Sequence, residues 1–165
     1  MARRPAQPPV IDLSFLLNQA SYAFAARLGG ALDEVGISVR EYCVLMKAAE
    51  AERTQIAIAE LAGLDKTTMV VTLDALERAG LAERRVSASD RRARVVGVTA
   101  EGRAVLDRAY AVVGVVTDAV LGDLDPIRRA AMVEALETLT AGLLSTPSHT
   151  APQRRRQVKA APASS

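Results

Sequence analysis

Five arginines are concentrated in a short stretch of this 165-residue chain, and their spacing favours the binding of an anion. Arg84, Arg85, Arg91, Arg92 and Arg94 lie within residues 84–94, and Asp90 is the only acidic residue in that stretch. Guanidinium groups pair in a bidentate manner with phosphate, and nucleic acid is the commonest partner of a localised basic block. The cluster therefore predicts a nucleic-acid-binding face, with a solvated charged hairpin as the alternative.

A second group of polar residues opens the helix that we expect just upstream. Lys66, Thr67 and Thr68 follow Asp65, a strong N-cap, so they fill the first turn and suit contacts with phosphate and base edges. Met69 and Thr72 are expected to face a DNA groove, where they would offer an apolar contact to thymine methyl groups and a hydroxyl. Ordinary first-turn composition, and partial burial of the last two residues, are the alternatives.

Catalytic and metal-dependent classes of protein find little support in the composition. Cys43 is the only cysteine and His149 the only histidine. One residue of each kind excludes an intramolecular disulfide framework, a multi-thiolate zinc site and most hydrolase triads. Cys43 is expected to be a small buried apolar residue. We therefore expect no enzyme, cofactor or metal, and we disfavour a small hydrolase or transferase.

The net charge of +2 conceals an uneven distribution along the chain. Residues 53–95 hold 8 basic and 6 acidic residues, whereas residues 96–145 hold 4 and 7, and residues 146–165 hold 4 and 0. Positive charge is thus placed in the middle and at the end of the chain. No apolar run approaches the roughly 20 residues of a membrane span, and no signal-type segment opens the sequence, so we expect a cytoplasmic protein.

Helical periodicity governs the chain on both sides of this basic region. Residues 1–9 hold three prolines and should form a mobile arm, and a long helix is expected from Val10 to about Leu32. Ser38 and Glu41 form a capping box that starts a helix reaching about Glu50. The region 54–80 predicts a helix, a tight turn at Gly63 and a second helix from Lys66 to about Ala79, which is the helix-turn-helix layout.

The second half of the chain predicts a hairpin and two closing helices. Two β-prone runs, residues 81–86 and 95–99, flank the polar, arginine-rich stretch 87–94 and indicate a β-hairpin. Thr99 is expected to cap a helix over about residues 100–121, and Asp125-Pro126 starts a last helix to about Leu144. Residues 146–165 are rich in Pro, Ser and Ala, with Arg154–Arg156 among them, and we expect a disordered basic tail.

A hairpin directly after a helix-turn-helix suits duplex DNA for a geometric reason. The second helix can enter the major groove while the hairpin beside it reaches the flanking backbone or the minor groove. An arginine at the hairpin tip, Arg91 or Arg92, could enter a narrow A·T-rich minor groove, with Asp90 fixing its guanidinium.

Three stretches together resemble the MarR family of transcriptional regulators. They are Leu61–Thr68 with Leu73–Leu81, Ser89-Asp90-Arg91-Arg92-Ala93, and the Thr99-x-x-Gly102 opening of the next helix, and their order and spacing make the resemblance specific. It spans about residues 11–145.

This resemblance implies a mainly α fold with a small β-hairpin wing, a winged helix-turn-helix with terminal dimerisation helices. The dimerisation helices would cover about residues 10–33 and 100–145, and the DNA-binding lobe about residues 38–99. The family's reading helix falls on Lys66 to Ala79, and its wing arginine on Arg92, with Asp90 as partner and Arg91 as alternate. The DNA-binding set predicted for this chain is Lys66, Thr67, Thr68, Met69, Thr72, Arg84, Asp90, Arg91, Arg92 and Arg94.

Two departures from the family pattern affect this interpretation. Many relatives carry an arginine five residues into the reading helix, where this chain has Val71. Base reading is therefore expected to rest on Thr67, Thr68, Met69 and Thr72. The peroxide-sensing branch keeps a cysteine in the first helix, where this chain has Ala20-Ser21-Tyr22, so thiol sensing is not supported.

The family often holds small aromatic molecules between the dimer helices and the DNA-binding lobe. The side chains best placed for such an effector are Tyr22, Arg27, Tyr42 and Tyr110, each of which could equally serve the core or the surface. The sequence thus predicts a homodimeric regulator, a repressor, that binds a pseudo-palindromic DNA operator, responds to a small aromatic effector and has no membrane partner. The alternative function is a winged-helix protein-interaction module that does not bind DNA specifically, an alternative that Val71 favours.

Overall fold

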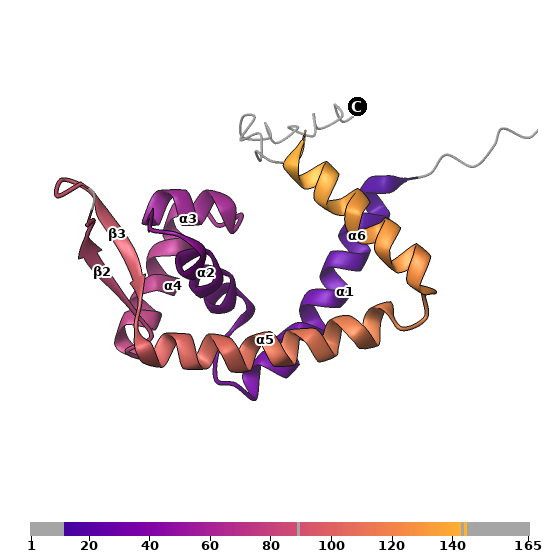
Figure 1. The fold of residues 1–165 in the computed structure, drawn as a ribbon, viewed down its shortest axis with the longest axis horizontal. Coiled ribbons are helices and arrows are strands. Elements are labelled where there is room, and N and C mark those ends of the chain that lie inside the picture. The colour runs from indigo at the N-terminus through magenta and orange to yellow at the C-terminus, as the bar shows by residue number, and fades with distance from the viewer. Residues whose placement is uncertain (1–11, 89, 143, 145–165) are drawn as a thin grey trace, which may run out of the picture.

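The structure is a computed structural model that describes residues 12–88, 90–142 and 144 of the chain. A lobe of short helices and a small sheet lies at one end, and long helices extend from it to the other end (Figure 1). The elements follow the order α1 Leu13–Asp33, α2 Val39–Glu50, β1 Arg53–Thr54, α3 Gln55–Leu61, α4 Lys66–Arg78, β2 Ala82–Val86, β3 Arg94–Val98, α5 Ala100–Leu121 and α6 Pro126–Ala141. The predicted fold class, mainly α with a small β wing, is confirmed. The expected arm 1–9 and tail 146–165 lie outside the described residues.

Side-chain caps explain where the helices begin. The predicted capping box is present: Glu41 N–H donates to Ser38 Oγ (3.3 Å), and Ser38 N–H donates to Glu41 Oε2 (2.7 Å). Asp65, Thr99 and Asp125 cap α4, α5 and α6 as expected. Because each cap satisfies amide groups that have no partner within the helix, it fixes the helical register as well as the first residue.

The sheet contains one strand that the sequence did not indicate. Its order is β1-β3-β2, antiparallel throughout, with Arg53 opposite Val96 and Ala82 opposite Val98. β1 has only two residues, which is too short for the alternation that marks a strand in a sequence. By pairing with β3, β1 connects the start of α3 to the wing, which consists of β2, β3 and the turn between them.

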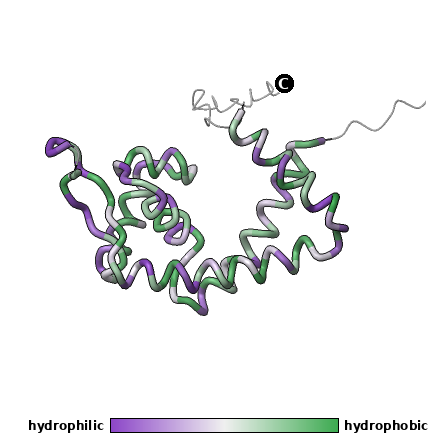
Figure 2. The backbone as a smooth tube through the Cα atoms, in the orientation of Figure 1, coloured by the Kyte–Doolittle hydropathy of each residue, from purple (hydrophilic) through white to green (hydrophobic). Residues whose placement is uncertain are grey.

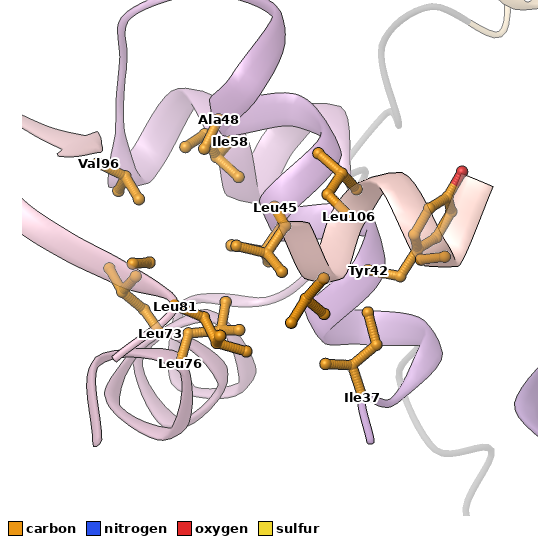
Figure 3. Packing of buried hydrophobic residues seen from close by; sticks show 14 of the residues in the cluster. Ile37, Tyr42, Leu45, Ala48, Ile58, Leu73, Leu76, Leu81, Val96 and Leu106 are labelled. Atoms are coloured by element: carbon orange, nitrogen blue, oxygen red, sulfur yellow. The ribbon is translucent and has the colours of Figure 1, made fainter. Parts of the chain in front are cut away.

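The core lies where α2, α4 and the start of α5 meet the sheet. Leu32, Leu45, Ile58, Leu73 and Leu76 are fully buried, and Figure 3 shows several of this cluster converging from different elements. Gly63 and Gly80 end α3 and α4 with φ values of +64° and +71°. These left-handed conformations favour glycine and turn the chain sharply, so that α4 packs back on the core.

The long helices expose apolar side chains that the core does not use. α6 has no buried residue, and Ile127 is 82% exposed. Phe15 and Leu16 on α1 are also exposed, and stretches of hydrophobic character are visible along these helices in Figure 2. Large apolar surfaces of this kind mark sites of association. None of the helices formed by the described residues is long and apolar enough to cross a membrane.

One glycine is required by close packing between α5 and the chain segment that follows α4. A Cβ placed on Gly102 would lie 1.9 Å from the carbonyl oxygen of Leu81 and 2.9 Å from Val98 Cγ1. The first of these contacts is with backbone, which cannot move aside as a flexible side chain can. Gly102 therefore lets the first turn of α5 pack directly on the chain that follows α4.

We predict that Gly102→Ala destabilises the fold by about 1–3 kcal/mol because the added methyl overpacks this contact. Gly114→Ala is the matched control on the same helix, since a Cβ there meets nothing within 4 Å. That control should leave stability unchanged or raise it by up to about 1 kcal/mol, the difference in helix propensity. Thermal and chemical unfolding measure both variants. Equal stabilities would contradict the prediction.

Candidate DNA-binding surface

The first turn of α4 is organised by its N-cap. Asp65 Oδ1 accepts the N–H of Thr68 (3.0 Å), and its other carboxylate oxygen accepts the Thr68 hydroxyl (2.5 Å). The hydroxyl and N–H of Thr68 stabilise the ionised form and lower the pKa of Asp65. Because the hydroxyl proton of Thr68 is donated to the Asp65 carboxylate, this hydroxyl in the present geometry can accept a hydrogen bond from a ligand but does not donate one to phosphate. Lys66 and Thr67 are exposed beside it, as expected.

Met69 and Thr72 face the core, and the prediction that they face a DNA groove is wrong. Met69 is 1% exposed and Thr72 is 7% exposed, and the Thr72 hydroxyl donates to the carbonyl oxygen of Thr68 (2.8 Å). Residues 69, 72, 73 and 76 form one stripe at helical spacing, and Leu73 and Leu76 already place that stripe inside. The sequence contained this signal, because Asp65 fixes the register of the helix.

The outer face of α4 carries Thr67, which belongs to the predicted set, together with three residues that the set omits. Thr67, Val71, Asp74 and Arg78 are exposed and recur at the spacing of one helical face. Val71 is 61% exposed at its centre. Sequence reasoning noted Val71 as a departure from the family pattern but did not place it on the surface that could meet a ligand.

Arg84 joins the wing to α4 rather than projecting freely. Its Nη2 lies 2.7 Å from Asp74 Oδ1, its Nη1 pairs with Glu77, and its Nε donates to Gln55 Oε1 (3.3 Å). Its backbone N–H also donates to Glu77 (2.7 Å). With four donors engaged, Arg84 positions β2 against α4, and the predicted role of this residue as a free DNA-binding cation is not supported by the geometry.

The tip of the wing presents the remaining predicted cations. Arg91, Arg92 and Arg94 are exposed. The carboxylate of Asp90 accepts the backbone N–H of Arg92 (2.9 Å). The expectation that Asp90 fixes the Arg92 guanidinium is therefore corrected: Asp90 shapes the turn backbone, because an aspartate readily accepts from the main chain two residues on.

A buried hydroxyl connects this turn to the rest of the lobe. Ser87 is 5% exposed, its Oγ accepts the N–H of Asp90 (3.1 Å), and its hydroxyl donates to Glu52. Glu52 lies between α2 and β1, and it also stands 3.6 Å from Nη2 of Arg85. Glu52 is a positioning residue that the sequence did not reveal, because it lies 35 positions from Ser87 along the chain.

The residues proposed for an effector do not form one site. Tyr42 is 7% exposed and meets Tyr110 edge to face, with ring centroids 6.0 Å apart. Burial raises the pKa of the Tyr42 hydroxyl, which keeps it neutral. Tyr110 lines a hollow of about 250 Å³ with Ala49, Glu50, Arg103, Leu106 and Asp107. Tyr22 lines a different hollow on α1, and Arg27 is exposed on that helix.

The surroundings of Cys43 disfavour its reactive form, and the described acidic residues do not cluster as metal ligands would. The Cys43 thiol is half-buried, and burial raises its pKa, which disfavours the reactive thiolate. In residues 12–88, 90–142 and 144, no three His, Cys, Asp or Glu side chains gather where they could hold a metal ion.

Comparison with known proteins agrees with the fold. The model of the MarR family matches residues 35–93. CouR from Rhodococcus jostii RHA1, in its crystal structure with p-coumaroyl-CoA, is 30% identical, with a TM-score of 0.72, and the match covers 81% of this chain and 95% of CouR. The chain belongs to the MarR family of transcriptional regulators.

Two further solved structures of the family are similar over most of their length. The repressor CouR bound to a 23-mer DNA duplex is 28% identical over 81% of this chain and 99% of CouR, with a TM-score of 0.70. A MarR family protein of Mycobacterium tuberculosis in complex with p-aminosalicylic acid is 27% identical over 77% of this chain and 97% of that one, with a TM-score of 0.67.

We predict that Glu52→Ala loosens the wing without unfolding the lobe. The substitution removes the acceptor of the Ser87 hydroxyl and should speed hydrogen exchange at residues 90–93, with a loss of about 1 kcal/mol in overall stability. Glu60→Ala, which removes an exposed carboxylate of α3 in the same lobe, is the control. Unchanged exchange in the wing of the Glu52 variant would show that another contact holds it.

The lowered pKa of Asp65 predicts how the stability conferred by this cap depends on pH. The folded-state value lies below the ordinary 3.8, so the stabilisation is fully present above that value and is lost as the pH falls through the folded-state pKa. Asp65→Asn keeps an acceptor at the cap but does not titrate. Thermal unfolding of both proteins should give a constant difference at neutral pH that shrinks in acid below 3.8. A difference independent of pH would contradict the assignment.

Proposed function

We propose that the protein is a sequence-specific DNA-binding repressor that acts as a homodimer and is released by a small-molecule effector. The observation that carries the proposal is the pairing of two features on one lobe. The exposed outer face of α4, with Lys66 and Thr67 in its first turn, lies beside a wing whose tip presents Arg91, Arg92 and Arg94. Such an arrangement places a helix in the major groove and a cation in the adjacent minor groove. The DNA-bound structure of CouR supports it.

The apolar surfaces of the long helices support the homodimer. Exposed hydrophobic side chains gather on α1 and α6, namely Leu13, Phe15, Leu16, Ile127, Met132, Val133, Leu136 and Leu139. Monomeric proteins rarely leave such surface in water, and a second copy related by a two-fold axis would cover it. The two reading helices would then enter successive major grooves roughly 34 Å apart on a pseudo-palindrome.

An aromatic effector is supported by the hollow next to Tyr110. Its lining combines the Tyr110 ring and Leu106 with Arg103 and the carboxylates of Glu50 and Asp107, so it offers an aromatic ligand apolar contacts and charged groups of both signs. Two similar regulators were solved with p-coumaroyl-CoA and with p-aminosalicylic acid, which both contain an aromatic ring. An effector that binds one dimer geometry more tightly than the other would shift the spacing of the reading helices and release the operator.

We predict that Arg92→Ala weakens binding to the operator by about 1–3 kcal/mol, because the wing loses the cation that enters the minor groove. The operator is first obtained by selecting bound duplexes from a random pool, and affinity is then measured by mobility shift over a series of salt concentrations. Binding by the unmodified protein should fall about 10³-fold or more between low and moderate salt if six or more phosphates are contacted.

Arg128→Ala is the matched control for this experiment. It removes the same charge from α6, at the end of the molecule opposite the wing (Figure 1), and should leave affinity unchanged. Sedimentation must show that both variants keep the oligomeric state of the unmodified protein. Equal affinities of the Arg92 variant and the unmodified protein would remove Arg92 from the interface. Failure to retain any duplex, or binding without salt dependence, would favour a winged-helix protein-interaction module.

A further inference from the structure

The outer face of α4 contains few groups that could read guanine. The basic residues of this helix are Lys66 at its first position and Arg78 at its last. Arg78 Nε donates to the carbonyl oxygen of Asp74 (3.2 Å), and the Asp74 carboxylate is paired with Arg84. The middle turns of α4 therefore present neither a guanidinium nor a carboxamide, the groups that make bidentate contacts with guanine or adenine.

What the middle of α4 does present is aliphatic. Val71 is 61% exposed, one turn after the hydroxyl of Thr67 and one turn before the Asp74–Arg84 ion pair. Val70 beside it is only partly buried. A β-branched side chain in a helix is nearly confined to one χ1 rotamer, so the Val71 methyl groups stand at a fixed position on this surface.

Thymine is the base whose edge matches such a surface. Its C5-methyl is the apolar group that the four base pairs display in the major groove. Contact between this methyl and Val71 removes apolar surface of both partners from water, whereas a polar base edge at that position would lose hydrogen bonds to water without replacement. The cations at the wing tip and at Lys66 lie on the same lobe, so the face of Val71 is continuous with the proposed DNA interface.

We propose that Val71 is a specificity-determining residue that contacts the methyl group of one thymine in each half-site of the operator. This inference rests on the proposed function and extends it to the kind of base that α4 reads. The sequence analysis expected Met69 to contact thymine methyl groups, but Met69 is buried, and the exposed Val71 takes that role here. A protein partner for the same apolar face is the competing outcome.

The test is a scan of the selected operator in which each thymine pair is replaced by deoxyuridine, which removes the methyl group and keeps the base pairing. Replacement at one thymine position, which occurs once in each half-site, should lower the affinity clearly more than replacement elsewhere. Loss of one buried methyl corresponds to about fourfold in affinity for each half-site, and so to about 15-fold for the dimer. Replacement at positions outside the α4 contacts should change affinity much less.

Val71→Ala then closes a double-mutant cycle with the deoxyuridine operator. If Val71 makes the contact, the variant binds the thymine operator more weakly and distinguishes thymine from deoxyuridine at that pair by about twofold or less. Thermal unfolding checks that the variant folds, as expected for an exposed position. Should it lose binding altogether, Val71→Thr, which keeps one of the two methyl groups, completes the cycle with an intermediate sensitivity.

The outcomes separate this inference from the function on which it rests. Undiminished sensitivity in Val71→Ala, or an operator without any sensitive thymine, overturns the role of Val71 and leaves DNA binding intact. If the unmodified protein retains no duplex from the pool, the proposed function fails and the inference fails with it. A preserved operator affinity in Val71→Ala together with loss of a protein partner would assign this face to that partner instead.

Discussion

The contact between the first turn of α5 and the chain segment after α4 is the constraint on which the rest of the structure depends. Thr99 Oγ1 donates to the carbonyl oxygen of Gly80 (2.7 Å), and Thr99 N–H donates to that of Leu81 (3.2 Å). The same Thr99 hydroxyl accepts the N–H of Gly102 (2.9 Å), and Gly102 has no room for a Cβ. One residue thus fastens the end of α4 to the start of α5, so these two helices have a fixed relative position.

The Thr99 contacts connect the outer face of α4 to the apolar surface that would form the proposed dimer. α5 runs from the lobe toward α1 and α6 (Figure 1). In the proposed dimer, its direction at Thr99 would therefore determine where the partner's α4 lies. The hollow lined by Tyr110 and Leu106 lies along α5 beside the end of α2, only a few turns from Thr99. A ligand bound there would contact side chains of α5 directly. Under the proposed function, small rotations of this helix would therefore become changes in the spacing of the reading helices.

Sequence reasoning located the helices well because their ends are determined locally. Asp65, Thr99 and Asp125 act on amides two or three residues away, and such caps can be recognised without any tertiary information. Contacts between distant segments could not be recognised in this way. Glu52 reaches the wing and Arg84 reaches α4 only because the fold brings them together. The placement of Met69 was an avoidable error, since the stripe of Leu73 and Leu76 already included it.

The ion pairs explain how a nearly neutral lobe can still present a basic edge. Within the described part of the lobe, the carboxylates of Asp74 and Glu77 pair with Arg84, and Glu52 lies close to Arg85. These pairs join the wing to its neighbours and neutralise charge at the base of the hairpin. The exposed arginines of the wing tip, Arg91, Arg92 and Arg94, would therefore supply much of the attraction to DNA in the proposed function. Attraction and selectivity consequently arise in different places under the proposed function: the wing provides the salt-dependent binding, and the uncharged middle of α4 provides the discrimination between bases.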